Sequence, residues 1–247
     1  MINNSILLLG SSGTLGYNIS KNHFFEKSFK PSSKILNLKK MDSIYNFFKK
    51  KNINIVIHCA AISSMAKCQN NPTEAINTNI IGTQNLVEVI RNLKKKIKLI
   101  YISTDGVYSP NQGNNSEEDI LNPYNIYCLT KLCAENIVKT TDNYVIIRTR
   151  FFDKNKIKFK SYATDIFTSA IEVTELVNYI KKIVNNKFTG VINIGGKRES
   201  NYDKMIRYNH EVKKCKYKDL IKNINYTIAK DASMNLNKMK KIFKNDK

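Results

Sequence analysis

Short apolar runs alternate with longer segments of helical periodicity along most of the chain. The runs are bounded by polar or turn-forming residues, which is typical of buried strands. The predicted strands are Ser5–Leu9, Lys34–Leu38, Asn54–His58, Lys98–Ser103, Tyr144–Ile147 and Val191–Ile194. The predicted helices are Thr14–Phe25, Asp42–Lys50, Glu74–Leu93, Tyr124–Thr140 and Thr174–Val184. This alternation predicts an α/β fold with a doubly wound parallel sheet. The tail from Lys197 onward is polar and weakly patterned.

Length and composition agree with one large domain, or one domain with a small appendage, since 247 residues are 42% hydrophobic and 25% charged. No apolar run approaches the ~18 residues of a membrane span, and Ile6–Leu9 is too short for the core of a signal peptide. Five cysteines at irregular spacing, with no C-x-x-C pair, argue against a disulfide framework or a zinc site. We therefore expect a cytoplasmic protein that holds no metal and does not enter a membrane.

The formal net charge of +21 raises the question of a nucleic-acid partner. Only five of the 41 basic residues are arginines, the side chain that base readers favour. The lysines are spread along the chain, so a solvated basic surface explains the charge better. We expect no nucleic-acid partner, and the charge is compatible with a small anionic ligand.

A glycine-rich turn, Gly10-Ser-Ser-Gly13-Thr-Leu-Gly16, directly follows the first predicted strand and opens a helix. Gly10 permits the tight turn, Gly13 lets the backbone approach a pyrophosphate, and Gly16 allows close packing of helix on strand. Amide groups at the helix N-terminus then bind phosphate. The context predicts a Rossmann-like dinucleotide site.

A second candidate feature is the pair Tyr127 and Lys131, which lie one turn apart on a predicted helix. An ammonium beside a phenol stabilises the phenolate, and is expected to lower the tyrosine pKa from about 10 toward working pH. The phenol can then protonate a carbonyl oxygen as a hydride arrives. Thr104 follows an apolar strand at the edge where such sheets bind ligands, so Thr104, Tyr127 and Lys131 form the predicted catalytic triad.

Several motifs resemble the dTDP-4-dehydrorhamnose reductase family, within the extended branch of the short-chain dehydrogenase/reductase superfamily. Ser103-Thr-Asp-Gly-Val-Tyr108 resembles the family's S-T-D-x-V-[FY] signature, and 122–135 resembles its segment around the tyrosine and lysine. His58-Cys-Ala-Ala61, Asn77-Thr-Asn79 and the strand ending at Arg148 resemble three further segments. The likeness is densest between residues 5 and 150.

The resemblance implies reduction of a nucleotide-activated 4-keto-6-deoxyhexose by NAD(P)H, in deoxysugar and surface polysaccharide biosynthesis. It implies that cofactor is bound by Gly10, Ser12, Gly13, Thr14, Leu15, Asn37, Ala60, Ala61, Asn79, Ser103, Tyr127 and Lys131. Substrate would meet Thr104, Asp105, Val107, Arg148, Arg150 and Phe151. Asn37 stands where an acid would select NAD, and Lys27, Lys30 and Lys34 precede it, so we expect NADP, with NAD as the alternative.

Departures from the family pattern concern the substrate more than the fold. Gly106 replaces an aromatic residue, so one wall of the sugar pocket would be missing, and Cys128 replaces a glycine. The stretch after Arg148 is short, which predicts a small, reduced C-terminal substrate lobe. The basic and aromatic segment Thr149–Phe159 is either a clamp for a nucleotide diphosphate or a solvated loop.

We therefore expect a dinucleotide-binding domain made of 1–148 plus 171–196, and a substrate lobe made of 149–170 plus 197–247. Alternatives left open are a 4-epimerase that retains its cofactor, and a non-catalytic regulatory subunit that binds cofactor. The sequence also leaves open a homodimer.

Overall fold

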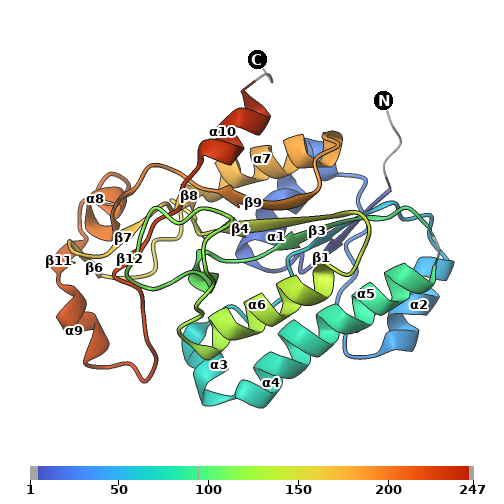
Figure 1. Ribbon diagram of the computed structural model, residues 1–247, viewed down its shortest axis with the longest axis horizontal. Helices are drawn as coiled ribbons and strands as arrows, with labels where there is room; N and C mark the ends of the chain where they lie inside the picture. The colour runs from blue at the N-terminus through green and yellow to red at the C-terminus, as the bar shows by residue number, and fades with distance from the viewer. Residues whose placement is uncertain (1–4, 94, 245–247) are drawn as a thin grey trace.

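Five parallel strands form one sheet at the centre of the computed structural model, which describes residues 5–93 and 95–244 (Figure 1). In sheet order they are β1 (Ile6–Leu9), β2 (Ile55–His58), β3 (Lys98–Ile102), β4 (Tyr144–Thr149) and β9 (Gly190–Ile194). The α/β fold and five of the predicted strands are thus confirmed. Because all five run the same way, their carboxyl ends meet at one edge of the sheet.

Helices cover both faces of the sheet, which is why its strands are apolar throughout. Ile6 and Leu8 of β1 pack with residues of one helical layer, while Leu7 and Leu9 pack with the other. The first layer is α1 (Thr14–Lys21), α7 (Val173–Asn185) and α10 (Asn237–Phe243), and the second is α2 (Met41–Lys49), α5 (Gly82–Asn92) and α6 (Ile126–Val138). The sheet therefore holds the β-strand ends, and the turns that follow them, in fixed positions.

The predicted strand Lys34–Leu38 is wrong, because the chain is irregular there. Among residues 5–93 and 95–244, the β contact on this side of β1 is a single bridge between Leu7 and Phe29, with hydrogen bonds of 2.8 Å on both sides. Pro31 follows two residues later and has no N–H to donate, which explains why pairing does not continue. The segment that would carry Asn37 is consequently a turn before α2.

The predicted helix Glu74–Leu93 is present but divided. It consists of α4 (Pro72–Ile76), a π-helical segment (Asn77–Ile81) and α5. The wide π turn buries Asn79 against α6. Such segments are often found near functional sites.

A small lobe follows β4 and lies at one end of the sheet, at the left of Figure 1. It contains β6 (Ser161–Ala163) paired with β11 (Lys213–Cys215), β7 (Phe167–Thr168) between β10 (Glu199–Ser200) and β12 (Asp231–Ala232), α8 (Asn201–Met205) and α9 (Tyr217–Ile221). At its base β5 (Phe151–Phe152) pairs with β8 (Ile171–Glu172). The expected small C-terminal lobe is confirmed, while the exact residue division between the two parts stays a prediction. Met239 and Phe243 of α10 pack in the same apolar cluster as the sheet.

Of the helices in the described part of the chain, none is long and apolar enough to cross a membrane.

Candidate active site

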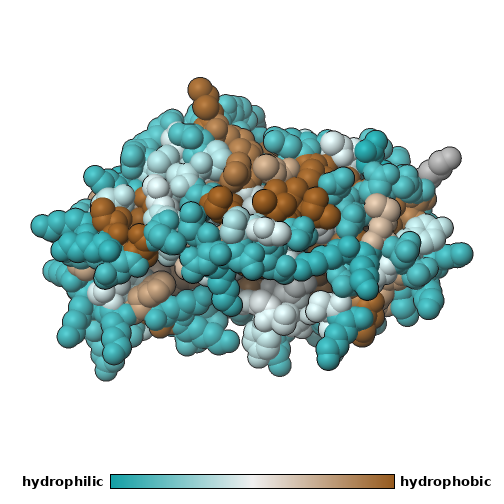
Figure 2. All heavy atoms as spheres, turned by 90° about the horizontal axis from the view of Figure 1, so that it is seen from below, coloured by the Kyte–Doolittle hydropathy of each residue, from teal (hydrophilic) through white to brown (hydrophobic). Residues whose placement is uncertain are grey.

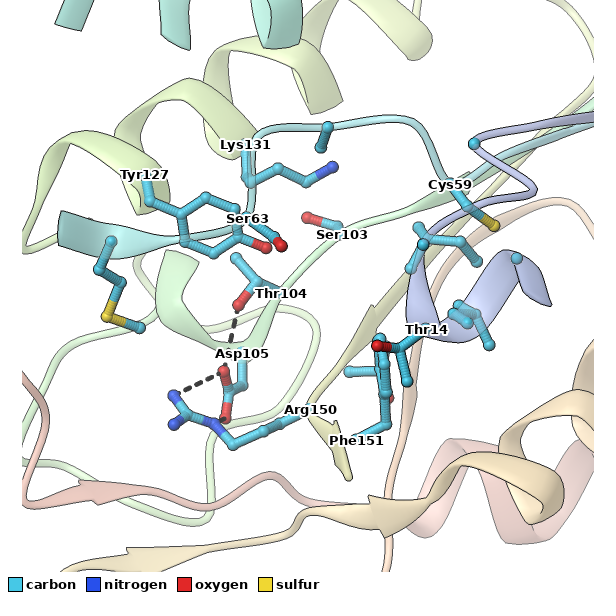
Figure 3. A pocket seen from close by; sticks show the side chains of 18 of the residues that line it. Thr14, Cys59, Ser63, Ser103, Thr104, Asp105, Tyr127, Lys131, Arg150 and Phe151 are labelled. Atoms are coloured by element: carbon cyan, nitrogen blue, oxygen red, sulfur yellow. Dashed lines mark hydrogen bonds and ion pairs between the residues drawn. The ribbon is translucent and has the colours of Figure 1, made fainter. Parts of the chain in front are cut away.

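A cavity of about 300 Å³ lies at the carboxyl ends of the strands, between the glycine turn, α6 and the start of the small lobe (Figure 3). It gathers residues that are far apart in the sequence. The predicted site residues that line it are Gly10, Gly13, Thr14, Leu15, Ala61, Ser103, Thr104, Asp105, Tyr127, Lys131, Arg150 and Phe151. Most of the candidate site is therefore brought to one place.

In the glycine turn, the packing of the backbone itself requires a glycine at positions 10 and 16. Gly10 has a φ of +82°, and a Cβ there would lie 2.6 Å from the backbone nitrogen of Ala60. A Cβ at Gly16 would lie 2.1 Å from the carbonyl oxygen of Gly10. At Gly13 a Cβ would meet nothing closer than 3.5 Å. Packing therefore does not explain the glycine at 13, whereas a ligand lying against this turn would.

Lys131 is a buried cation facing the cavity. Its side chain is buried at 3% residue exposure, and its ammonium lies 4.0 Å from the centroid of the Tyr101 ring. No hydrogen-bond partner for the ammonium is found within 5–93 and 95–244. Burial lowers the pKa of Lys131 to about 7, against the opposing influence of Glu135 and Cys59. A buried ammonium with unused donors is poised to bind hydroxyl groups of a ligand.

Tyr127 points into the same cavity from one turn earlier on α6 (Figure 3). Burial, reinforced by Cys128 and Asp105, raises the pKa of Tyr127 above its usual value of 10. The expectation of a lowered pKa is therefore wrong for the protein alone, because desolvation of the phenol outweighs the opposing influence of the nearby cation, Arg150. At neutral pH the phenol carries its proton and can act as a donor.

The hydroxyl of Thr104 also reaches the cavity wall, but it has local partners. It accepts a hydrogen bond from the Gly106 N–H (3.1 Å) and donates to Asp105 at 3.2 Å (Figure 3). It thereby caps the short 3₁₀ turn Asp105–Val107. Ser103, one residue earlier, donates instead to the buried carboxylate of Glu135 at 2.5 Å.

Asp105 and Arg150 form a two-pronged ion pair beside Thr104. Arg150 donates from Nε (2.6 Å) and from a terminal nitrogen (3.0 Å) to the two carboxylate oxygens. The carboxylate is fully buried, while Arg150 keeps 30% of its side chain exposed. Arg150 also lines a second cavity of about 440 Å³ in the small lobe, together with Met65, Tyr124, Tyr162 and Tyr226. Arg150 and Met65 therefore lie in the walls of both cavities.

Six predicted site residues do not line the cavity. Arg148 is buried and its guanidinium faces Glu135 and Tyr108, so we correct its assignment from substrate contact to structural ion pair. Val107 packs with Tyr108 and Met234 in a separate apolar cluster, so we correct its assignment from substrate contact to core packing.

The other four were expected at the cofactor. Asn79 holds the backbone of Ile62 through its side-chain amide, and thus positions the segment after β2. Asn37 accepts a hydrogen bond from the Lys39 N–H before α2. Ala60 packs below the glycine turn, and Ser12 is exposed at the tip of that turn.

The cavity also contains residues that the motifs did not single out as site residues, namely Cys59, Ser63, Met65, Thr149 and Lys158. Cys59 directly follows β2 and Thr149 ends β4, so the rule that ligands bind at strand ends could have identified these two. Lys158 lies in the basic segment whose role was left open. The structure brings this lysine to the cavity wall with Arg150 and Phe151.

The two departures at positions 106 and 128 compensate for each other. A Cβ placed at Gly106 would lie 2.4 Å from the Sγ of Cys128. The thiol is buried, so it occupies the space that a side chain at 106 would need. The space next to Gly106 is therefore filled from α6, behind the cavity lining, which includes neither Gly106 nor Cys128.

Comparison with known proteins agrees with this geometry. The family model described as the RmlD substrate binding domain matches residues 4–176. A structure of dTDP-4-dehydrorhamnose reductase from Bacillus anthracis str. Ames in complex with NADP is similar with a TM-score of 0.85, at 20% identity, over 96% of this chain and 92% of that one. The resemblance inferred from the sequence motifs is thereby confirmed.

Two curated relatives match shorter stretches. A dTDP-D-glucose 4,6-dehydratase of Dictyostelium discoideum is 32% identical over 176 residues, which are 55% of this chain and 39% of that protein. The methionine adenosyltransferase 2 subunit beta of Bos taurus is 29% identical over 145 residues, which are 55% of this chain and 43% of that protein. The matched stretch thus spans less than half the length of either relative.

Proposed function

Since this chain belongs to the RmlD substrate-binding-domain family, we propose that it reduces a nucleotide-activated 4-keto-6-deoxyhexose, with NADPH as hydride donor. The observation that carries this proposal is the convergence of the glycine turn, Tyr127 and Lys131 on one cavity. A dTDP-4-dehydrorhamnose-like substrate is the first candidate, because the family motifs and the structural relatives agree on it. Such a reaction would supply deoxysugars for surface polysaccharide.

The residues present fit a nicotinamide dinucleotide. The turn at Gly13 leaves space that a Cβ would fill, and the N-terminus of α1 offers amide groups to a phosphate. The ammonium of Lys131 offers donors that the described protein atoms leave unused. When bound, the cofactor would supply the hydride. Lys131 would hold its ribose hydroxyls, and Gly10, Gly13 and Thr14 would face its phosphates.

Tyr127 would supply the proton for the substrate oxygen. Its raised pKa keeps the phenol protonated at neutral pH. As negative charge develops on the carbonyl oxygen, the phenol is the acid that faces it, and Lys131 stabilises the resulting phenolate. The half-charged state of Lys131 near pH 7 makes this step sensitive to pH.

Thr104 can hydrogen-bond the same substrate oxygen without losing its structural role. The Thr104 oxygen accepts a hydrogen bond from the Gly106 N–H, and the Thr104 hydroxyl donates a long hydrogen bond of 3.2 Å to Asp105. Asp105 keeps both hydrogen bonds from Arg150, so it can release this contact. The hydroxyl proton is thus available to substrate.

We propose NADP rather than NAD as the natural cofactor. The place where an acidic residue would bind free ribose hydroxyls carries Asn37, and the surrounding segment is rich in lysine. Comparing NADPH with NADH in the same assay tests this preference. A higher kcat/KM with NADH would contradict it.

The proposed function is tested by following NADPH oxidation with a panel of nucleotide-linked 4-keto-6-deoxyhexoses. We expect Tyr127→Phe to lower kcat by about 10²–10⁴-fold, because the general acid is lost, while the Kd for NADPH changes little. Tyr144→Phe, on β4 and outside the cavity lining, is the matched control.

Two outcomes would contradict the proposal. A Tyr127→Phe variant with the wild-type rate would show that the phenol is not the acid. Tight NADPH binding with no turnover of any keto sugar would favour the non-catalytic regulatory subunit that the sequence leaves open. The bovine relative is likewise named as a subunit, methionine adenosyltransferase 2 subunit beta.

A further inference from the structure

Glu135 is a fully buried carboxylate that lies one helical turn beyond Lys131, yet it does not line the cavity. The Ser103 hydroxyl donates a hydrogen bond of 2.5 Å to one oxygen of this carboxylate. Arg148 donates to both oxygens, with its shortest hydrogen bond at 2.8 Å. The carboxylate thus connects a cavity residue with an ion pair behind it.

The ion pair is itself fixed from behind. A terminal nitrogen of Arg148 donates to the Tyr108 hydroxyl (2.9 Å), and that hydroxyl donates to Asn193 on β9 (2.7 Å). The amide of Asn193 donates to backbone oxygens of Asn115 and Asn235. Each group has little freedom to turn, so the orientation of Glu135 is determined by the surrounding protein and not by a ligand.

The charged and titratable groups around Lys131 are few. On α6 it has Tyr127 and Glu135 as neighbours. It also faces His58, the last residue of β2, and Cys59 directly after it, and its ammonium lies over the ring of Tyr101 on β3. Burial keeps His58 uncharged by lowering its pKa to about 3, and raises the pKa of Cys59 to about 12. Glu135, which forms an ion pair with Arg148, is therefore the carboxylate in this set.

From this arrangement we propose that Glu135 is a positioning residue of the active site. It holds the Ser103 hydroxyl in place at the cavity wall and supplies the counter-charge that keeps the Lys131 ammonium protonated. The inference deepens the proposed function, on which its activity measurements rest. Arg148 is the partner that holds the Glu135 carboxylate in its orientation.

The proposal is tested first by a measurement that needs no substrate. Competitive labelling with trace acetic anhydride, followed by mass spectrometry of the peptide that contains Lys131, gives the pH midpoint at which this amine loses its proton. We expect Glu135→Gln to lower the midpoint by about one unit, because an opposite charge is lost. Glu118→Gln, whose side chain is 73% exposed in the loop before α6, is the control and should leave it unchanged.

Turnover then separates positioning from general stability. Ser103→Ala should lower kcat by about tenfold without moving the Lys131 midpoint, since the ion pair stays intact. Glu135→Gln should lower kcat at least as much and shift the pH profile of kcat to lower pH. The double variant Ser103→Ala/Glu135→Gln should have a kcat no lower than that of Glu135→Gln alone, because both changes act on the same hydrogen bond between Ser103 and Glu135.

Glu135→Gln leaves the Arg148 charge buried without its counter-ion, which can prevent folding. Glu135→Gln/Arg148→Met removes both charges, and the same lowered Lys131 midpoint is expected from it. A Lys131 midpoint that stays at the wild-type value in either folded variant overturns the inference, even where sugar reduction is fast. Absence of turnover in every form, with the midpoint lowered, would contradict the proposed reaction but support the role of Glu135.

Discussion

The contact between Gly106 and Cys128 gives the sharpest test of the packing around the site. Gly106→Ala places a Cβ 2.4 Å from the Cys128 Sγ, where more than 3.4 Å is the ordinary contact distance. Gly106 needs no left-handed backbone, so the added methyl acts through packing alone. Overpacking of this kind destabilises a buried site by about 1–3 kcal/mol. We expect a loss in the free energy of unfolding of that size.

A second substitution should reverse this loss. In Gly106→Ala/Cys128→Ala the Sγ is gone, and the nearest atom on residue 128 is its Cβ, 3.5 Å away. Cys128→Ala alone removes one buried atom and should cost about 1 kcal/mol. The double variant should be close to the wild type, which gives a favourable coupling of about 2–4 kcal/mol in a double-mutant cycle.

Urea unfolding followed by circular dichroism suits this cycle, because the chain has no tryptophan. Cys133→Ala, on the same helix but away from Gly106, is the control for the second substitution. It should not restore the stability of Gly106→Ala. Equal stability of Gly106→Ala and wild type, or equal rescue by Cys133→Ala, would refute the idea that the two positions exchange volume.

Three further predictions follow from the same geometry. Gly16→Ala should lower the free energy of unfolding in urea by about 3 kcal/mol or more, because its Cβ would lie 2.1 Å from a carbonyl oxygen. Gly13→Ala should stay folded but bind NADPH more weakly in calorimetry. An unchanged NADPH affinity in Gly13→Ala would contradict the assignment of this turn to phosphate binding. Arg148→Met should lower the free energy of unfolding by about 3–5 kcal/mol, since it leaves Glu135 buried without its partner, and an unchanged urea midpoint would refute this. Lys131→Met should be more stable than wild type at pH 7. Because the pKa of Lys131 is lowered from 10.5 to about 7 on folding, the unfolded chain binds more protons between these values, so the wild type should regain this stability as pH rises to about 10.5; a stability difference that does not depend on pH would contradict the burial of the ammonium.

Much of the fold could be predicted because its strands are buried on both faces. Ile6–Leu9 and Ile55–His58 are apolar at consecutive positions, a pattern that marks central parallel strands. Lys34–Leu38 has a similar apolar content, but Ile35 is 64% exposed. Local pattern cannot show that the neighbouring β1 is already paired with Phe29 and that Pro31 ends the pairing.

The candidate site was predictable where chemistry follows backbone position. Tyr127 and Lys131 lie one turn apart, and Thr104 follows a strand, so the α/β topology alone brings them to one edge of the sheet. Arg148 and Arg150 are both close to the end of β4, and the sequence treats them alike. Two residues two apart on one strand would face the same side, but β4 ends at Thr149 and Arg150 lies beyond it. Arg148 therefore meets Glu135, whereas Arg150 meets Asp105. Which arginine faces the cavity depends on partners that no local motif contains.

The exchange at Gly106 and Cys128 shows why departures from a family pattern have to be read in space. Taken singly, a glycine in place of an aromatic residue predicts an open wall, and a cysteine in place of a glycine predicts a crowded helix. The structure brings the two positions into contact, so the volume lost from one is partly supplied by the other. Both residues are buried and neither lines the cavity, so the exchange conserves packing behind Asp105 and does not reshape the surface that a ligand would meet.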